Sequence, residues 1–268
     1  MELTWRWGKI GLFFAASDRQ EVAFVVEKIQ EKMTKYDLSW TDVAIFYRTN
    51  AQSLLFEESL LQAAIPYQII GGLSFYQRKE IKDVLAYLRV AVSGSDLVAL
   101  SRTINVPKRG LGAKTVEKIL QHVAEKKQDP ILTLQEIVSG YNLPLKISAR
   151  QKEGLAKYVA AIKTLRQQIT DLMPISLLIQ SCLKLFNYDA YIQEDPEYYS
   201  DRKENIQALI SRANEWEKDH PAATLTTFLE ELSLNQPARV QSEEQIKLMT
   251  LHNGKGLEFS LVFVVGVE

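Results

Sequence analysis

Polar and basic side chains follow two apolar runs of this sequence, at the points where strands are expected to end. Arg48 and Asn50 come directly after the run 43–47, and Thr250 and His252 come at the end of a later apolar run. In open α/β sheets, ligands bind at the carboxyl ends of the strands. A guanidinium group binds phosphate or carboxylate through paired N–H donors, and an amide can pair with a base edge. These residues therefore indicate either a binding site at a sheet edge or an ordinary solvated loop.

Lys255 lies between Gly254 and Gly256, two residues that would let a phosphate group approach the main chain. The same three residues also suit a solvated turn. The run Asn-Gly-Lys-Gly is not a Walker A loop, because the spacing Gly-x-x-x-x-Gly-Lys-Ser/Thr occurs neither here nor elsewhere in the chain. The sequence therefore contains no phosphate loop of the kind that hydrolyses ATP.

A third candidate is the turn made by Gly110 and Gly112, which precedes a predicted helix. Lys108, Arg109 and Lys114 surround these two glycines. The free N–H groups at a helix N-terminus bind anions, and three nearby cations would favour the phosphates of a DNA backbone. Phosphate contacts carry no base information, so binding here would not depend on DNA sequence. The alternative is a tight helix–helix turn with ordinary surface cations.

No other residues form a catalytic or metal-binding pattern. The single cysteine, Cys182, lies in an apolar stretch, which excludes an intramolecular disulfide and a cysteine-based zinc site. His122 and His220 have no second ligand at metal-binding spacing. No Ser/His/Asp or Cys/His arrangement can be argued. We therefore expect neither a metal site nor a nucleophilic catalytic site.

The charge of the chain is unevenly distributed. The 268 residues are 46% hydrophobic and 24% charged, a balance typical of globular proteins, and the net charge is −1. Residues 76–127 contain eleven basic and five acidic residues, whereas residues 192–244 contain five basic and twelve acidic ones. The neutral total thus hides a basic region, which includes the glycine turn and suits nucleic acid, and an acidic region that could meet a protein partner.

The hydrophobic periodicity predicts an α/β domain interrupted by helices. Strands are expected at 10–15, 43–47 and 67–70, with helices from 17 to 33 and from 53 to 63, an order typical of a parallel sheet. Strand signals then disappear until 246–251 and 261–265, and the intervening segments have helical spacing with prolines between them. The simplest arrangement returns the last two strands to the first sheet.

We therefore expect two domains, one of which is split. Residues 1–72 and 243–268 would form the α/β domain, and residues 73–242 would form an all-α insertion. The chain stops directly behind a predicted parallel strand, where a covering helix or further strand would normally follow, so we expect it to be a piece of a longer protein. No apolar run approaches the ~18–20 residues that a membrane span needs, and no signal peptide is evident, which favours a cytoplasmic protein without membrane contact.

Seven segments stand out in chain order, namely 47–53, 65–72, 75–76, 78–83, 86–89, 105–112 and 249–259. Their sequences and their order resemble the UvrD/PcrA/Rep family of superfamily-one DNA helicases. Residues 105–112 are similar to the Arg-Gly-Ile-Gly element of that family, and residues 249–259 are similar to its motif V. The similarity extends across the whole chain.

This resemblance implies a RecA-like partial sheet, subdomain 2A, interrupted by the helical subdomain 2B. The family residues that match Arg48, Asn50, Thr250 and His252 contact single-stranded DNA. The glutamate that matches Glu258 holds the ribose of ATP, and the lysine that matches Lys255 lies close to it. The turn that includes Lys108, Arg109, Gly110, Gly112 and Lys114 would grip duplex DNA ahead of the fork.

The sequence also departs from the family pattern. Leu54 replaces the usual arginine after Gln-Ser, and Asn253-Gly254 replaces Ser-Ala or Ala-Ala, so we expect a looser motif V loop. The Walker A lysine, the Asp-Glu pair, the Gln-Asn-Tyr-Arg segment and the arginine finger have no counterpart here. We therefore expect a fragment of an ATP-dependent 3′→5′ DNA helicase. The full-length parent would use ATP and Mg²⁺, whereas the fragment alone would bind neither and would not hydrolyse ATP.

Two other interpretations stay open. The chain could work alone as a non-catalytic DNA-binding or protein-docking module, or it could be the degenerate helicase part of a larger helicase–nuclease. In each case the expected partner is DNA, as single strand and as duplex junction, with repair or replication proteins as further candidates.

Overall fold

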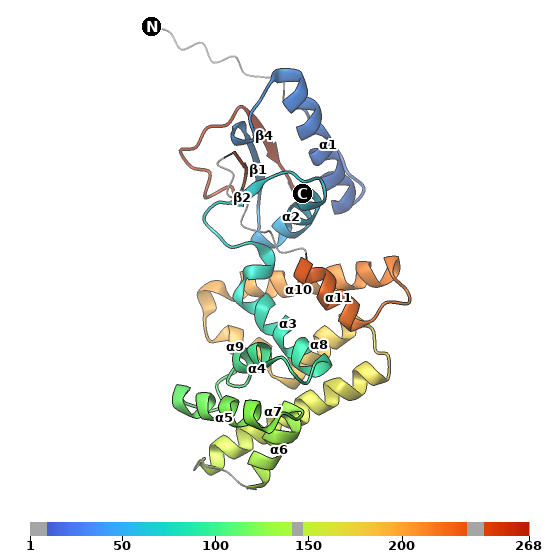
Figure 1. Cartoon of the computed structure of the whole chain (residues 1–268). Helices are drawn as coiled ribbons and strands as arrows, with labels where there is room; N and C mark the ends of the chain where they lie inside the picture. Colours follow the sequence, from blue (N-terminus) through green and yellow to red (C-terminus); the bar gives the residue numbers. More distant parts are fainter. Residues whose placement is uncertain (1–9, 141–146, 235–243, 268) are drawn as a thin grey trace. The chain divides into compact units, whose positions relative to one another are not determined.

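The computed structural model describes residues 10–140, 147–234 and 244–267. The chain divides into two compact units, residues 1–72 with 239–268 (unit 1) and residues 73–238 (unit 2). Unit 1 contains a parallel sheet and unit 2 is helical where the structure describes it (Figure 1). The predicted α/β fold with a helical insertion between its strands is confirmed. The second predicted domain boundary, between residues 242 and 243, lies outside the described residues.

Unit 1 is built on four parallel strands in the order β2-β3-β1-β4. The strands are β1 (Val43–Tyr47), β2 (Tyr67–Ile69), β3 (Ile246–Thr250) and β4 (Leu261–Val264). In β1, alternate side chains point to opposite faces, so Val43, Ile45 and Tyr47 share one face. Two helices, α1 (Asp18–Tyr36) and α2 (Ser53–Gln62), pack their apolar sides into the same core as these residues.

The opposite face of the sheet is crossed by the connection from β3 to β4. Phe46 points to this face, and its ring lies against Gly254 of the connection. The Phe46 ring also meets the ring of Phe259 edge to face, with centroids 6.1 Å apart. Because Leu261 pairs with Val43, the connection carries the chain from the carboxyl end of β3 to the amino end of β1.

The prediction of a strand at residues 10–15 is wrong. These residues are outside the sheet, whose edges are β2 and β4. Phe13 stacks on Phe24 of α1 with ring centroids 3.6 Å apart, whereas Ile10 and Phe14 are exposed. A short apolar run resembles a buried strand in its composition, but a strand also needs a neighbouring backbone with which to pair.

Unit 2 is organised around α3 (Lys79–Val92), ten of whose fourteen residues are buried. Helix α3 packs against α4, α7, α8, α10 and α11 (Figure 1). The other helices are α4 (Leu97–Thr103), α5 (Ala113–Lys126), α6 (Pro130–Ser139), α7 (Ala149–Thr170), α8 (Ile175–Leu185), α9 (Tyr188–Gln193), α10 (Pro196–Asp219) and α11 (Leu225–Leu234). Pro130 and Pro196 stand at helix starts, where a missing N–H costs no hydrogen bond.

Two buried carboxylates of α3, Glu80 and Asp83, are hydrogen-bonded within unit 2. Asp83 accepts hydrogen bonds from Nε of Arg102 at 2.7 Å and from the hydroxyl of Tyr188 at 2.8 Å. Asn205 donates to Glu80 at 2.7 Å.

Among the described residues, no helix is both long enough and apolar enough to cross a membrane.

Candidate functional site

The carboxyl ends of β1 and β3 bring four of the predicted site residues to one edge of the sheet. Tyr47 pairs with Thr250, and the N–H of Leu251 donates to the carbonyl of Tyr47 at 3.2 Å. Arg48 and His252 therefore start from neighbouring strands at the same edge. Their side chains are exposed, whereas Asn50 and Thr250 are half-buried. We refer to Arg48, Asn50, Thr250 and His252 together as the strand-end group.

Gln52 holds the loop that carries Arg48. Its Oε1 accepts from the N–H of Arg48 at 2.9 Å and from the N–H of Thr49 at 3.0 Å, so the main chain is fixed while the Arg48 side chain faces solvent. Gly266, which follows β4, comes so close that a Cβ there would lie 1.9 Å from Nε2 of Gln52. Sequence reasoning gave Gln52 no role, because its acceptor function depends on the folded loop.

The loop after β3 is held at the two positions where the sequence departs from the family. Nδ2 of Asn253 donates to the carbonyl of Ile70 at 3.2 Å. Gly254 lies so close to the sheet that a Cβ there would be 2.1 Å from Cε1 of Phe46. Gly71 has a φ of +73° and faces the Asn253 side chain. Contrary to the expectation of a looser loop, both departing residues have defined contacts with the sheet and its loops.

Lys255 and Glu258 lie along the connection that crosses the sheet. The N–H of Leu257 donates to the carbonyl of Gly254 at 3.0 Å, which closes a turn around Lys255. Glu258 directly precedes Phe259, whose ring contacts Phe46. Both charged side chains are exposed. They could supply a carboxylate and an ammonium group to a nucleotide, but no group of three His, Cys, Asp or Glu side chains in the described residues could hold a metal ion.

The glycine turn of unit 2 is fastened by Asn105. Its Oδ1 accepts from the N–H of Arg109 at 2.8 Å, and its Nδ2 donates to the carbonyl of Leu111 at 2.7 Å. Gly112 is the N-cap of α5 and has no side chain to bond the first N–H groups of the helix. The N–H of Thr115 donates to the carbonyl of Gly112 at 2.9 Å, and residues 112–114 are exposed. Lys108 and Lys114 are exposed on either side of the turn.

The sequence suggested that Arg109 joins these two lysines at the surface, but its side chain points inward. Its guanidinium lies 4.9 Å from the ring centroid of Tyr158 and 5.7 Å from that of Phe186, a cation–π arrangement. Nη1 donates to main-chain carbonyls at 2.9–3.2 Å, namely those of Thr103, Ile104, Val106 and Pro107. The prediction that all three cations surround an anion is corrected here: the Arg109 side chain points inward because carbonyls and aromatic faces satisfy it there.

Helix α7 braces the same turn. Nε2 of Gln151 donates to the carbonyl of Gly110 at 2.8 Å. Gly154 allows the helix to approach, since a Cβ at this position would lie 2.9 Å from Cβ of Arg109 and 3.2 Å from its carbonyl oxygen. The sequence contained no signal for either contact, because residues some forty positions apart meet only in the folded unit.

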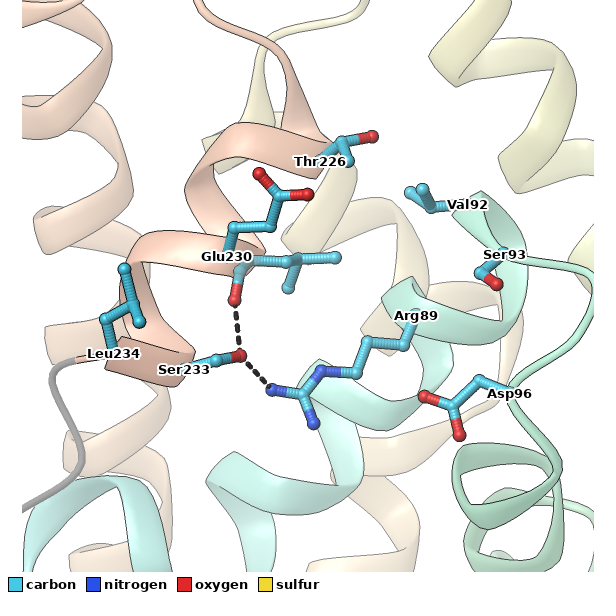
Figure 2. A pocket seen from close by; sticks show the side chains of 9 residues that line it. Arg89, Val92, Ser93, Asp96, Thr226, Glu230, Ser233 and Leu234 are labelled. Carbon is cyan, nitrogen blue, oxygen red and sulfur yellow. Dashed lines mark hydrogen bonds between the residues drawn. The ribbon is translucent and has the colours of Figure 1, made fainter. Parts of the chain in front are cut away.

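Unit 2 also has a hollow of about 520 Å³ between α3 and α11 (Figure 2). Nη2 of Arg89 donates to the hydroxyl of Ser233 at 2.9 Å, and that hydroxyl donates to the carbonyl of Leu229 at 2.7 Å. Asp96 and Glu230 also line the hollow, so its single arginine faces two carboxylates. Such a lining does not suit a phosphate group.

Comparison of the sequence with known proteins identifies the family of this chain. Residues 7–268 match the family model described as UvrD-like helicase C-terminal domain. The chain therefore belongs to this family, and the resemblance inferred from its motifs is confirmed.

Individual relatives are named ATP-dependent DNA helicase PcrA. The protein from Staphylococcus epidermidis is 34% identical over 264 residues, which are 97% of this chain and 35% of the relative. The protein from Staphylococcus aureus gives the same identity and coverage. The chain thus spans about a third of the length of the curated relatives that it matches.

Proposed function

We propose that this chain is the DNA-contacting piece of an ATP-dependent helicase that moves 3′→5′ along single-stranded DNA. Unit 1 would be subdomain 2A and unit 2 subdomain 2B. The observation that carries the proposal is the convergence of the strand-end group at the carboxyl ends of β1 and β3, where open α/β sheets bind ligands. Membership of the UvrD-like family and the name of the PcrA relatives support it.

The strand-end group would bind single-stranded DNA through complementary chemistry. The exposed Arg48 guanidinium would pair with a backbone phosphate, and the Asn50 amide and Thr250 hydroxyl would donate to or accept from sugar and base atoms. Imidazole stacking by His252 would add a contact that tolerates any base, since every base has a π face. Such contacts suit a protein that moves along DNA without sequence preference.

The glycine turn would contact duplex DNA. Lys108 and Lys114 are exposed, as is the start of α5 at residues 112–113, so this surface would offer positive charge and main-chain donors to a phosphate. Arg109 would serve this contact indirectly by holding the turn. In this proposal Arg109 is a positioning residue.

Glu258 and Lys255 would form part of the ATP site of the full-length helicase. Glu258 would accept hydrogen bonds from ribose hydroxyls, with Lys255 nearby. Phosphoryl transfer additionally requires a phosphate loop, Mg²⁺ ligands and an arginine finger, and this sequence has no Walker A spacing. The chain alone would therefore bind DNA without hydrolysing ATP.

Binding of a fluorescent single-stranded oligonucleotide tests the proposal. Arg48→Ala should weaken the affinity about tenfold, because it removes a charge-assisted hydrogen bond to phosphate. Lys35→Ala, at the end of α1, removes an exposed cation away from the strand-end group and serves as the matched control. Equal affinities of the two variants would show that the strand-end group does not bind DNA.

A further inference from the structure

A cationic hollow lies beside the glycine turn, between the turn and the helices α7 and α8. Its volume is about 440 Å³. Lys108, Arg109, Arg150 and Lys157 line it together with one carboxylate, Glu153. Phe186 contributes an apolar part of the wall. No role follows for Arg150 or Lys157 from the strand-end group, the glycine turn or the nucleotide residues described above.

Positive charge dominates this hollow. Lys108, Arg150 and Lys157 are exposed, so their charges are available to a ligand. Glu153 accepts a hydrogen bond from Nζ of Lys157 at 2.7 Å, and this bond, with the charges of Lys157 and Arg150, lowers the pKa of Glu153. One carboxylate thus stands among three exposed cations, whereas the hollow near Arg89 has two carboxylates and one arginine.

The backbone fixes where these cations stand. Arg150, Gly154 and Lys157 are four and three residues apart, so they lie on one face of α7. Gly154 marks the side of this face that meets the turn, because its position has no room for a Cβ beside Arg109. Arg150 and Lys157 therefore flank the contact between α7 and the turn, next to the exposed Lys108.

We propose that this hollow is a second phosphate site, which takes a backbone phosphate of duplex DNA adjacent to the one held by the turn. Arg150 and Lys157 would contact this phosphate, and Lys108 would serve both. The proposal rests on the proposed duplex contact of the turn. A polymer is favoured over a free phosphate because the hollow is open and shares the exposed Lys108 with the turn, so consecutive phosphates of one strand can be bound together.

Duplex binding by the whole chain tests this site. The double variant Arg150→Ala/Lys157→Ala should bind a fluorescent hairpin duplex about tenfold more weakly, with a slope of log K against log salt shallower by about two. Its affinity for single-stranded DNA should not change. Lys163→Ala/Lys184→Ala is the matched control. It also removes two exposed cations, one from α7 and one from α8, and both lie outside the hollow. Circular dichroism would verify that both variants fold.

The outcomes separate this inference from the proposed function. If the hollow variant binds duplex like the control while Lys114→Ala binds more weakly, the second site is wrong and the turn contact stands. If Lys114→Ala also binds like wild type, the turn contact itself is wrong. A titration with inorganic phosphate at constant ionic strength distinguishes the ligand source: a change in phosphate affinity without a change in duplex affinity would overturn the assignment to DNA.

Discussion

The strand-end group of unit 1 and the glycine turn of unit 2 differ in where their arginine side chains lie. In unit 1 the side chains of Arg48 and His252 are exposed, and other residues such as Gln52 and Asn253 hold the neighbouring main chain. In unit 2 the arginine of the turn, Arg109, points inward, and the flanking Lys108 and Lys114 are exposed. An arginine next to a glycine-rich or polar loop is thus exposed to solvent in one region and supports the main chain in the other.

Because of this difference, we expect substitutions to affect DNA binding and stability differently in the two regions. In unit 1, removing an outward side chain should lower binding and leave stability unchanged. In unit 2, removing Arg109 should lower stability first, and any loss of duplex binding should follow from the disordered turn. The predictions below test this contrast.

The largest expected effect is that of Arg109→Ala. It removes hydrogen bonds to main-chain carbonyls and cation–π contacts with Tyr158 and Phe186, so the free energy of unfolding should fall by about 2–4 kcal/mol. Urea denaturation followed by circular dichroism, which the helices of unit 2 dominate, measures this change.

Two variants control for the charge and for the position of Arg109. Lys108→Ala removes an exposed neighbour and should change stability by less than about 0.5 kcal/mol. Arg109→Lys keeps the charge but loses the planar fork, so it should recover only part of the stability. Equal stability of Arg109→Ala and Lys108→Ala would contradict the inward role of the arginine.

A smaller effect is expected for Gly254→Ala in unit 1. The added Cβ would lie 2.1 Å from the Phe46 ring, so the loop or the ring must shift, at a cost of about 1–3 kcal/mol. Hydrogen exchange measured by mass spectrometry should become faster in peptides that cover 43–50 and 246–260. Gly11→Ala is the control, because a Cβ at Gly11 meets nothing within 4 Å. Unchanged exchange in Gly254→Ala would mean that the loop does not depend on this contact.

Much of the fold could be predicted because periodic patterns are local. The continuous apolar run Val43–Tyr47 indicated β1, and the spacing of apolar residues indicated the helices of unit 2. The run 10–15 misled the prediction, since composition does not reveal whether a segment has a strand to pair with. The return of the last two strands to the first sheet was predicted and is confirmed, since β3 and β4 both pair with β1.

The candidate site was predictable in position but not in the direction of each side chain. The placement of Arg48, Asn50, Thr250 and His252 follows from where strands end. The direction of Arg109 does not, because it depends on Tyr158 and Phe186, which lie far away in the sequence and reach the turn only through packing of α7 and α8. The same reason hid the bracing of the turn by Gln151.

The most direct test of the account measures the affinities of two variants for two DNA forms. Fluorescence anisotropy would compare Arg48→Ala and Lys114→Ala with wild type on a single-stranded oligonucleotide and on a blunt hairpin duplex. Arg48→Ala should weaken binding to the single strand alone, and Lys114→Ala should weaken binding to the duplex alone. If each variant weakened binding to both DNA forms equally, the division of DNA contacts between the two units would be contradicted.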